Sequence, residues 1–141
     1  MLKNIPPILS PDLFHVLMEM GHGDELVLAD GNFPSASLAR RIIRCDGQEI
    51  LPLLEAILLF FPLDYRVAQA AMMEIPQGTD CLSRELVYRP LLEKSFGEKV
   101  EIVMEERDSF YNRASQAYAI VATSDTTRFS NLIIRKGVVT I

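Results

Sequence analysis

The sequence has little of the residue types that build disulfide frameworks, metal centres or basic binding surfaces. It contains two cysteines and two histidines, and its fourteen lysines and arginines are outnumbered by nineteen acidic residues, for a net charge of −5. An acidic chain without a stripe of basic residues is a poor binder of nucleic-acid phosphates or of an anionic membrane surface. Cys45 and Cys81 lack metal-ligand spacing and give no disulfide framework, so we expect free thiols in a cytoplasmic protein.

Long apolar runs are also missing. The most apolar stretch, ILPLLEAILLFFPL at residues 50–63, contains Glu55, Pro52 and Pro62 and is shorter than the roughly 20 residues that span a bilayer. This stretch predicts a buried helix instead. The N-terminal residues MLKNIPPILSPDLF lack the apolar segment of a secretory signal, and their prolines argue against one. We therefore expect no membrane association and no secretion.

Helical and strand patterns alternate along the chain. Capped or amphipathic segments predict helices at 10–21, 48–61, 83–97 and 107–117, while short apolar runs predict strands at 25–30, within 66–75, and at 100–104, 118–124 and 131–141. Segment 39–45 fits a helical turn followed by a short strand. The alternation is typical of a three-layer α/β domain with a mixed, mostly parallel sheet. The last two strands, joined by a turn at 125–130, predict a C-terminal antiparallel hairpin. No linker interrupts the pattern, so residues 1–141 are predicted to form a single domain.

His22 occupies a position suited to chemistry. It lies in MGHGDELVLAD (20–30), between a predicted helix that Gly21 would end in a left-handed conformation and a predicted strand. Both elements can hold such a loop rigidly, and Gly23 permits close approach of a ligand. An imidazole can give and take a proton near neutral pH, and the acidic residues that follow would favour its charged form. The alternative is a histidine that only hydrogen-bonds the turn.

Other polar residues lie where strands or helices meet loops. Asp30 ends its strand, where ligands of α/β sheets gather, although it could also simply form the turn. Arg107 opens a helix whose dipole favours anions there, which indicates either a functional placement or a surface salt bridge. Phe129, Ser130 and Asn131 share a turn that offers an aromatic face and an amide edge, as sugar recognition requires, although asparagine is also a common turn residue.

Several other kinds of site find no match in the sequence. The glycines near His22 form neither GxGxxG nor a P-loop, and neither Ser35 nor Ser37 lies in a nucleophile elbow. The spacing between His22 and its neighbouring acids fits no metal signature, and no second histidine is placed to complete a zinc site. We therefore expect no bound metal, no nucleotide and no covalent intermediate.

Four segments taken together resemble one family. MGHGDELVLAD, IIRCDG, RDSFYNRASQAYAIVAT and FSNLIIRKGV follow one another as in the RbsD/FucU family of sugar mutarotases, and the resemblance covers nearly the whole chain. The HGDE form and ADGNFP resemble the L-fucose mutarotase branch. The resemblance implies a cofactor-free isomerase that interconverts the α and β anomers of L-fucose. It also implies a homo-oligomer, often a decamer in this family, with the site near a contact between subunits.

The resemblance also implies roles for individual residues. His22 would be the proton donor, Asp30 and Arg107 would bind substrate, and Tyr111 would line the pocket. It implies neither a cofactor nor a metal, and it does not identify the base.

The turn at Phe129, Ser130 and Asn131 would add a further sugar contact by the same resemblance. The family usually has tyrosine at the position of Phe129, so this chain lacks that phenol hydroxyl. The backbone of Ser130 and the side chain of Asn131 could still bind the sugar. Two alternatives stay open beside an L-fucose mutarotase, namely a pyranase acting on D-ribose and a non-catalytic sugar-binding or transport-associated subunit.

Overall fold

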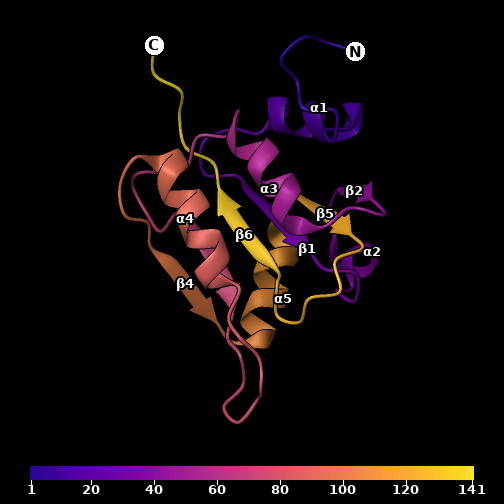
Figure 1. The fold of residues 1–141 in the computed structure, drawn as a ribbon, viewed down its shortest axis with the longest axis vertical. Helices are drawn as coiled ribbons and strands as arrows, with labels where there is room; N and C mark the ends of the chain where they lie inside the picture. The colour runs from indigo at the N-terminus through magenta and orange to yellow at the C-terminus, as the bar shows by residue number, and fades with distance from the viewer.

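The computed structural model describes all residues 1–141 and has a six-stranded mixed sheet at its centre (Figure 1). The strands are arranged in the order β2-β5-β1-β6-β3-β4. Their bounds are β1 (Glu25–Ala29), β2 (Ile42–Cys45), β3 (Ala70–Met73), β4 (Ile102–Glu105), β5 (Ala119–Thr123) and β6 (Leu132–Arg135). Only β6 runs against the others, pairing antiparallel with β1 on one side and β3 on the other. The predicted mixed, mostly parallel sheet is confirmed.

The predicted C-terminal hairpin is wrong, although β6 is antiparallel as expected. β1 lies between β5 and β6, with Leu26 opposite Ala119 on one side and Ile134 on the other. The physical reason is the burial of β1, whose residues after Glu25 are all shielded from solvent, so that it needs a strand on each side. The connection at 124–131 is accordingly longer than the roughly two to five residues of a hairpin loop. It crosses the end of β1 instead.

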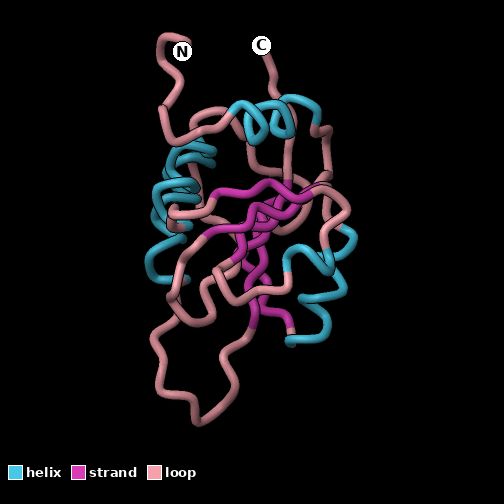
Figure 2. The backbone as a smooth tube through the Cα atoms, turned by 90° about the vertical axis from the view of Figure 1, so that its right-hand side faces the viewer, coloured by secondary structure: helices cyan, strands magenta, loops and turns pink.

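Helices cover both faces of the sheet and form three layers (Figure 2). Alternate residues of β1 point to opposite faces. Leu26 and Leu28 join the larger apolar core, which includes buried residues of α1 (Pro11–Glu19), α3 (Ile50–Leu58) and α4 (Glu85–Phe96). Val27 and Ala29 join a smaller core on the other face, beneath α2 (Ser35–Leu38) and α5 (Arg107–Gln116). The three-layer prediction is confirmed.

The most apolar stretch of the sequence forms α3, as its composition predicts. Ile50, Leu53, Leu54 and Ile57 are completely buried, and Pro52 lies in the first turn, where its missing N–H has no intrahelical partner to lose. None of the helices is both long and apolar enough to cross a membrane.

The loop that carries His22 differs in one detail from expectation. α1 begins as predicted, with the Leu13 N–H donating to Ser10 Oγ (3.1 Å). It does not end in a left-handed Gly21, however. The Gly21 N–H donates to Asp24 Oδ2 (2.7 Å), and Gly23 takes the left-handed conformation with φ +88°. The turn before β1 is therefore closed by Asp24 and depends on Gly23.

Gly137 lies where the segment after α3 meets the end of β6. Its N–H donates to the Pro62 carbonyl (2.7 Å), and an antiparallel bridge joins Leu63 to Lys136. A Cβ at this glycine would collide with the Leu63 carbonyl oxygen and lie 2.8 Å from the Leu63 carbonyl carbon. Because both obstacles are backbone atoms, no side-chain rotation can relieve the clash.

We predict that Gly137→Ala lowers the free energy of unfolding by about 1–3 kcal/mol, the usual cost of forcing an extra methyl into a filled space. Urea or thermal unfolding of the purified variant measures the change. Gly21→Ala is the matched control, because the nearest atom to its added methyl is at an ordinary 3.7 Å. Equal stability of the two variants would show that the backbone at residue 137 has room for a side chain.

Candidate functional site

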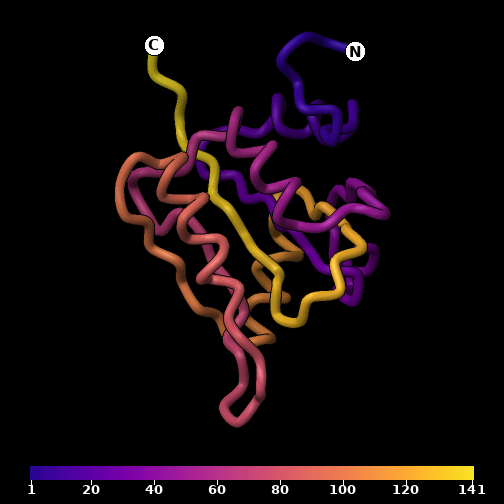
Figure 3. Tube along the Cα trace, viewed as in Figure 1, coloured from indigo at the N-terminus to yellow at the C-terminus, as the bar shows by residue number.

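The predicted site residues lie at two opposite edges of the sheet. His22 precedes β1 and Asp30 follows it, so a five-residue strand, roughly 17 Å long, separates them. We call the first the histidine edge (His22, Asp64 and Arg135). The second, the carboxyl edge, consists of Asp30, Arg107, Tyr111 and residues 129–131. In Figure 3 the start of β1 and the end of β6 lie towards the two termini, and the turn before β6 lies away from them.

At the carboxyl edge, Asp30 and Asn131 contact each other. The Asp30 N–H donates to Asn131 Oδ1 (2.8 Å), and Asp30 Oδ1 accepts from the Asn32 N–H (2.9 Å). Both side chains are buried. Burial raises the pKa of the Asp30 carboxyl, and the nearby Asp125 adds to this, whereas N–H groups of the following turn partly offset it. A carboxyl and an amide therefore lie side by side at this edge.

The turn at residues 129–131 contains backbone N–H groups that have no partner within the chain. Phe129 has φ +52°, a conformation that is uncommon for a bulky residue. No hydrogen bond within the chain uses the N–H groups of Phe129, Ser130 or Asn131. The Ser130 hydroxyl donates to the Thr127 carbonyl (2.7 Å), and the Ser130 carbonyl accepts from the Tyr88 hydroxyl (2.7 Å). Ser130 is completely buried in the single chain, and its N–H, unlike its hydroxyl, has no partner there.

Arg107 reaches the same edge through aromatic contacts. The residue is exposed at the start of α5, and its guanidinium lies 5.1 Å from the centre of the Tyr111 ring. Tyr111 packs edge-on against Phe33, with ring centres 5.1 Å apart, and Phe33 belongs to the turn that follows Asp30. A free cation thus lies beside aromatic surface at the edge that carries Asp30.

At the histidine edge, a buried carboxylate holds the imidazole. His22 Nε2 lies 3.1 Å from Asp64 Oδ1; the histidine side chain is 36% exposed and that of Asp64 only 1%. The Arg66 N–H donates to Asp64 Oδ1 (3.0 Å), and Arg135 Nε donates to Oδ2 (2.8 Å). Burial alone would raise the pKa of Asp64, but these hydrogen bonds lower it to about 2. A neutral imidazole that donates from Nε2 to this carboxylate leaves Nδ1 as a proton acceptor.

The sequence did not identify Asp64 as the partner of His22. The acids close to His22 in sequence are engaged elsewhere: Asp24 accepts from Gly21, and Glu25 accepts from Arg113 at 2.9 Å and 2.6 Å. No hydrogen bond or ion pair joins either of them to the imidazole, whose partner is Asp64. A single charged residue in FPLDY, directly after an apolar helix, is the signal that was available. Nothing in the spacing connected it with a histidine 42 positions earlier.

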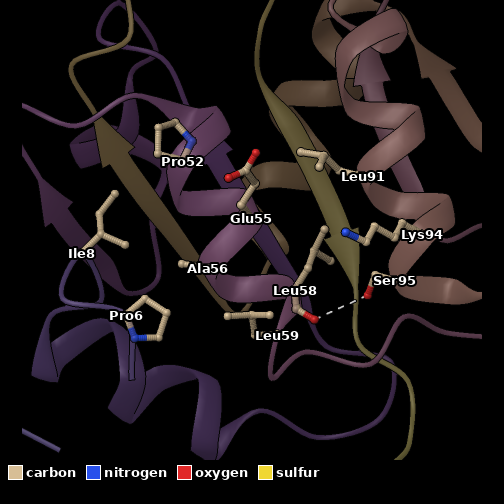
Figure 4. Close-up of a pocket in the computed structure, with 10 residues that line it drawn as sticks. All are labelled: Pro6, Ile8, Pro52, Glu55, Ala56, Leu58, Leu59, Leu91, Lys94 and Ser95. Carbon is tan, nitrogen blue, oxygen red and sulfur yellow. Dashed lines mark hydrogen bonds between the residues drawn. The ribbon is translucent and has the colours of Figure 1, made fainter. Parts of the chain in front are cut away.

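Outside these two edges, the structure shows an apolar groove but no metal-binding cluster. No group of three or more histidine, cysteine, aspartate or glutamate side chains is placed to hold a metal ion. The groove lies between the N-terminal segment, α3 and α4, where Leu58 and Leu59 face Lys94 and Ser95 (Figure 4). None of the predicted site residues lines it. Cys45 and Cys81 are both free thiols.

Comparison with known proteins gives concordant matches. Residues 3–139 match the RbsD / FucU transport protein family. The L-fucose mutarotase of Actinobacillus pleuropneumoniae is 45% identical over 140 residues, covering 98% of this chain and 97% of the relative. The fucose mutarotase of Danio rerio is 47% identical over 146 residues, covering 98% and 94%.

Solved structures agree with the sequence relatives. The fucose mutarotase of Streptococcus pneumoniae, crystallised in complex with L-fucose, superposes with a TM-score of 0.91 at 46% identity, covering 99% of this chain and all of that one. Family match, relatives and fold coincide over nearly every residue, and the chain belongs to the RbsD / FucU family.

Proposed function

We propose that this protein is an L-fucose mutarotase, a cofactor-independent isomerase that interconverts the α and β anomers of the sugar. Full-length relatives that bear this name and a fucose-bound structural neighbour support the proposal. The single observation that carries the mechanism is the imidazole of His22, partly exposed and anchored on a buried, ionised carboxylate.

The chemistry requires only proton transfers. Opening a pyranose ring needs a proton delivered to the ring oxygen and another removed from the anomeric hydroxyl, and closure on the other face reverses both. A positioned acid or base accelerates such steps by about 10²–10⁴-fold. Asp64 orients the His22 ring through its hydrogen bond to Nε2, while the exposed side of the ring exchanges protons with the sugar. His22 is the proton donor in this proposal.

The carboxyl edge supplies the binding half of the site. Asp30 and Asn131 present oxygen and amide groups that pair with sugar hydroxyls, and the unused N–H groups of residues 129–131 add donors. Arg107 donates to sugar oxygens from the side of α5. The rings of Tyr111 and Phe129 offer apolar surface to the C–H face of the sugar. Small-molecule sites commonly combine such apolar walls with a few polar groups that fix the orientation of the ligand.

Since one chain keeps these halves at opposite edges, a complete site requires two copies. We propose that the histidine edge of one copy meets the carboxyl edge of another in a cytoplasmic homo-oligomer, and that the oligomer is a decamer. The strand-length separation of His22 from Asp30 supports the shared site. The resemblance to the family supports the decamer, which native mass spectrometry of the purified protein would measure.

We predict that the wild-type protein accelerates exchange between the anomeric protons of α- and β-L-fucose in NMR saturation-transfer experiments. His22→Ala should lower the rate by about 10²–10⁴-fold, because the proton carrier is lost. His15→Ala is the matched control, since His15 is an exposed residue of α1 whose imidazole pairs with Glu19 (2.9 Å) and lies outside both edges.

An unchanged rate in His22→Ala would refute its role. Fucose binding without acceleration by the wild type would favour the sugar-binding subunit instead. Parallel measurements with D-ribose and D-galactose rank the substrates and separate a fucose mutarotase from a pyranase.

A second prediction concerns the shared site. His22→Ala and Asp30→Asn should each be inactive alone, but co-expressed or co-refolded chains should regain activity. In random mixtures about a quarter of the contacts join an intact histidine edge to an intact carboxyl edge. Mixed assemblies that native mass spectrometry detects, yet that remain inactive, would place the whole site within one chain.

A further inference from the structure

We propose that Arg135 is a positioning residue for the reaction, fixing the Asp64 carboxylate, and through it the His22 ring, in the orientation that proton transfer requires. The inference rests on the proposed mutarotase function, but part of its test is independent of activity.

The hydrogen bonds at Asp64 divide its two oxygens between different partners. Oδ1 serves His22 and the Arg66 N–H, whereas Oδ2 accepts only from Arg135 Nε, at 2.8 Å. Without the guanidinium, Oδ2 has no partner in a side chain that is 1% exposed. Removing one partner of a buried ion pair leaves the remaining charge uncompensated, and we expect the carboxylate to turn towards other donors or water. Rotation of the carboxylate would then move Oδ1 away from the imidazole.

The backbone around Asp64 is held by contacts that do not involve the Arg135 side chain. The Asp64 N–H donates to the Arg135 carbonyl (3.0 Å), and the Arg135 N–H donates to the Gln69 carbonyl (3.0 Å). The Gln69 amide in turn donates to the Asp64 carbonyl (2.7 Å). These bonds survive a change of the side chain at residue 135, so a substitution there acts on the orientation of the carboxylate more than on the path of the chain.

The guanidinium also lies against the loop that carries His22. A Cβ placed on Gly23 would be 3.1 Å from Arg135 Nη2 and 3.7 Å from Cζ. The Gly23 N–H donates to the Lys136 carbonyl (2.8 Å), so the loop is tied to the residue after Arg135. Arg135 therefore contacts both the backbone beside the imidazole and the carboxylate that binds its ring.

The neighbouring charges leave Arg135 available to Asp64. Glu25, its register partner across β1 and β6, lies 3.7 Å from Nη1 but is already paired with Arg113 at 2.6 Å. Arg113 also binds Glu105 (3.2 Å). The short, well-directed contact of Arg135 is the one to Asp64, and the contact to Glu25 is secondary.

The kinetic test compares Arg135→Gln with Arg135→Lys by anomer-exchange NMR over a range of L-fucose concentrations. We expect Arg135→Gln to lower kcat by about 10–100-fold, because small misplacements of catalytic groups are that costly. KM should stay within about twofold, because the sugar contacts lie at the other edge. Arg135→Lys should restore part of kcat, since it keeps the charge but not the planar fork. Lys136→Gln is the control, because the only hydrogen bond of Lys136 Nζ goes to the Gly137 carbonyl (3.3 Å).

The spectroscopic test uses ¹⁵N NMR of the His22 ring. The wild type should show the tautomer protonated at Nε2, and Arg135→Gln should show a mixture of both tautomers. A folded Arg135→Gln with wild-type kcat and a wild-type ring spectrum would overturn the proposal. If this variant does not fold, Arg135→Lys decides: a lower kcat at unchanged KM supports the proposal, and a wild-type kcat overturns it. A wild type without mutarotase activity would refute the proposed function, while the tautomer change would still establish the positioning of His22.

Discussion

The need to pair one buried charge organises the histidine edge. Asp64 is almost completely shielded from solvent, so its carboxylate can stay ionised only with donors around it. Three parts of the chain supply them: the loop before β1 through His22, the end of β6 through Arg135, and the backbone of Arg66. Because the resulting pKa is about 2, the group is an anion over the whole range in which the protein would work. The same contact joins three segments and orients the imidazole.

The position of β6 explains the other edge. By running antiparallel between β1 and β3, β6 begins at the carboxyl edge and ends at the histidine edge. Asn131, the residue just before β6, therefore hydrogen-bonds the backbone of Asp30. Arg135, the last residue of β6, hydrogen-bonds the Asp64 carboxylate. One short strand thus contributes to both halves of the proposed site. A hairpin between β5 and β6 would have left β1 without its second neighbour and Asn131 without Asp30.

Local patterns in the sequence were sufficient for most of the fold. The apolar run before Asp30 predicted β1, and the segments predicted as helices at 10–21 and 83–97 contain α1 and α4. Strand order could not be read in this way, since neighbours in a sheet are chosen by packing between segments distant in sequence. Asp64 was missed for the same reason. The separation of His22 from Asp30 could, however, have been predicted from the sequence, because the two residues flank one strand and its ends cannot come together.

Placing the two half-sites at opposite edges also limits the shapes that a working assembly can take. When each site joins the histidine edge of one copy to the carboxyl edge of another, an open row of copies leaves one histidine edge unpaired at one end. It leaves one carboxyl edge unpaired at the other end. Only a closed ring or a closed dimer pairs every histidine edge with a carboxyl edge. Selection for the largest number of complete active sites per chain would then favour a closed assembly, even if closing it added no stability.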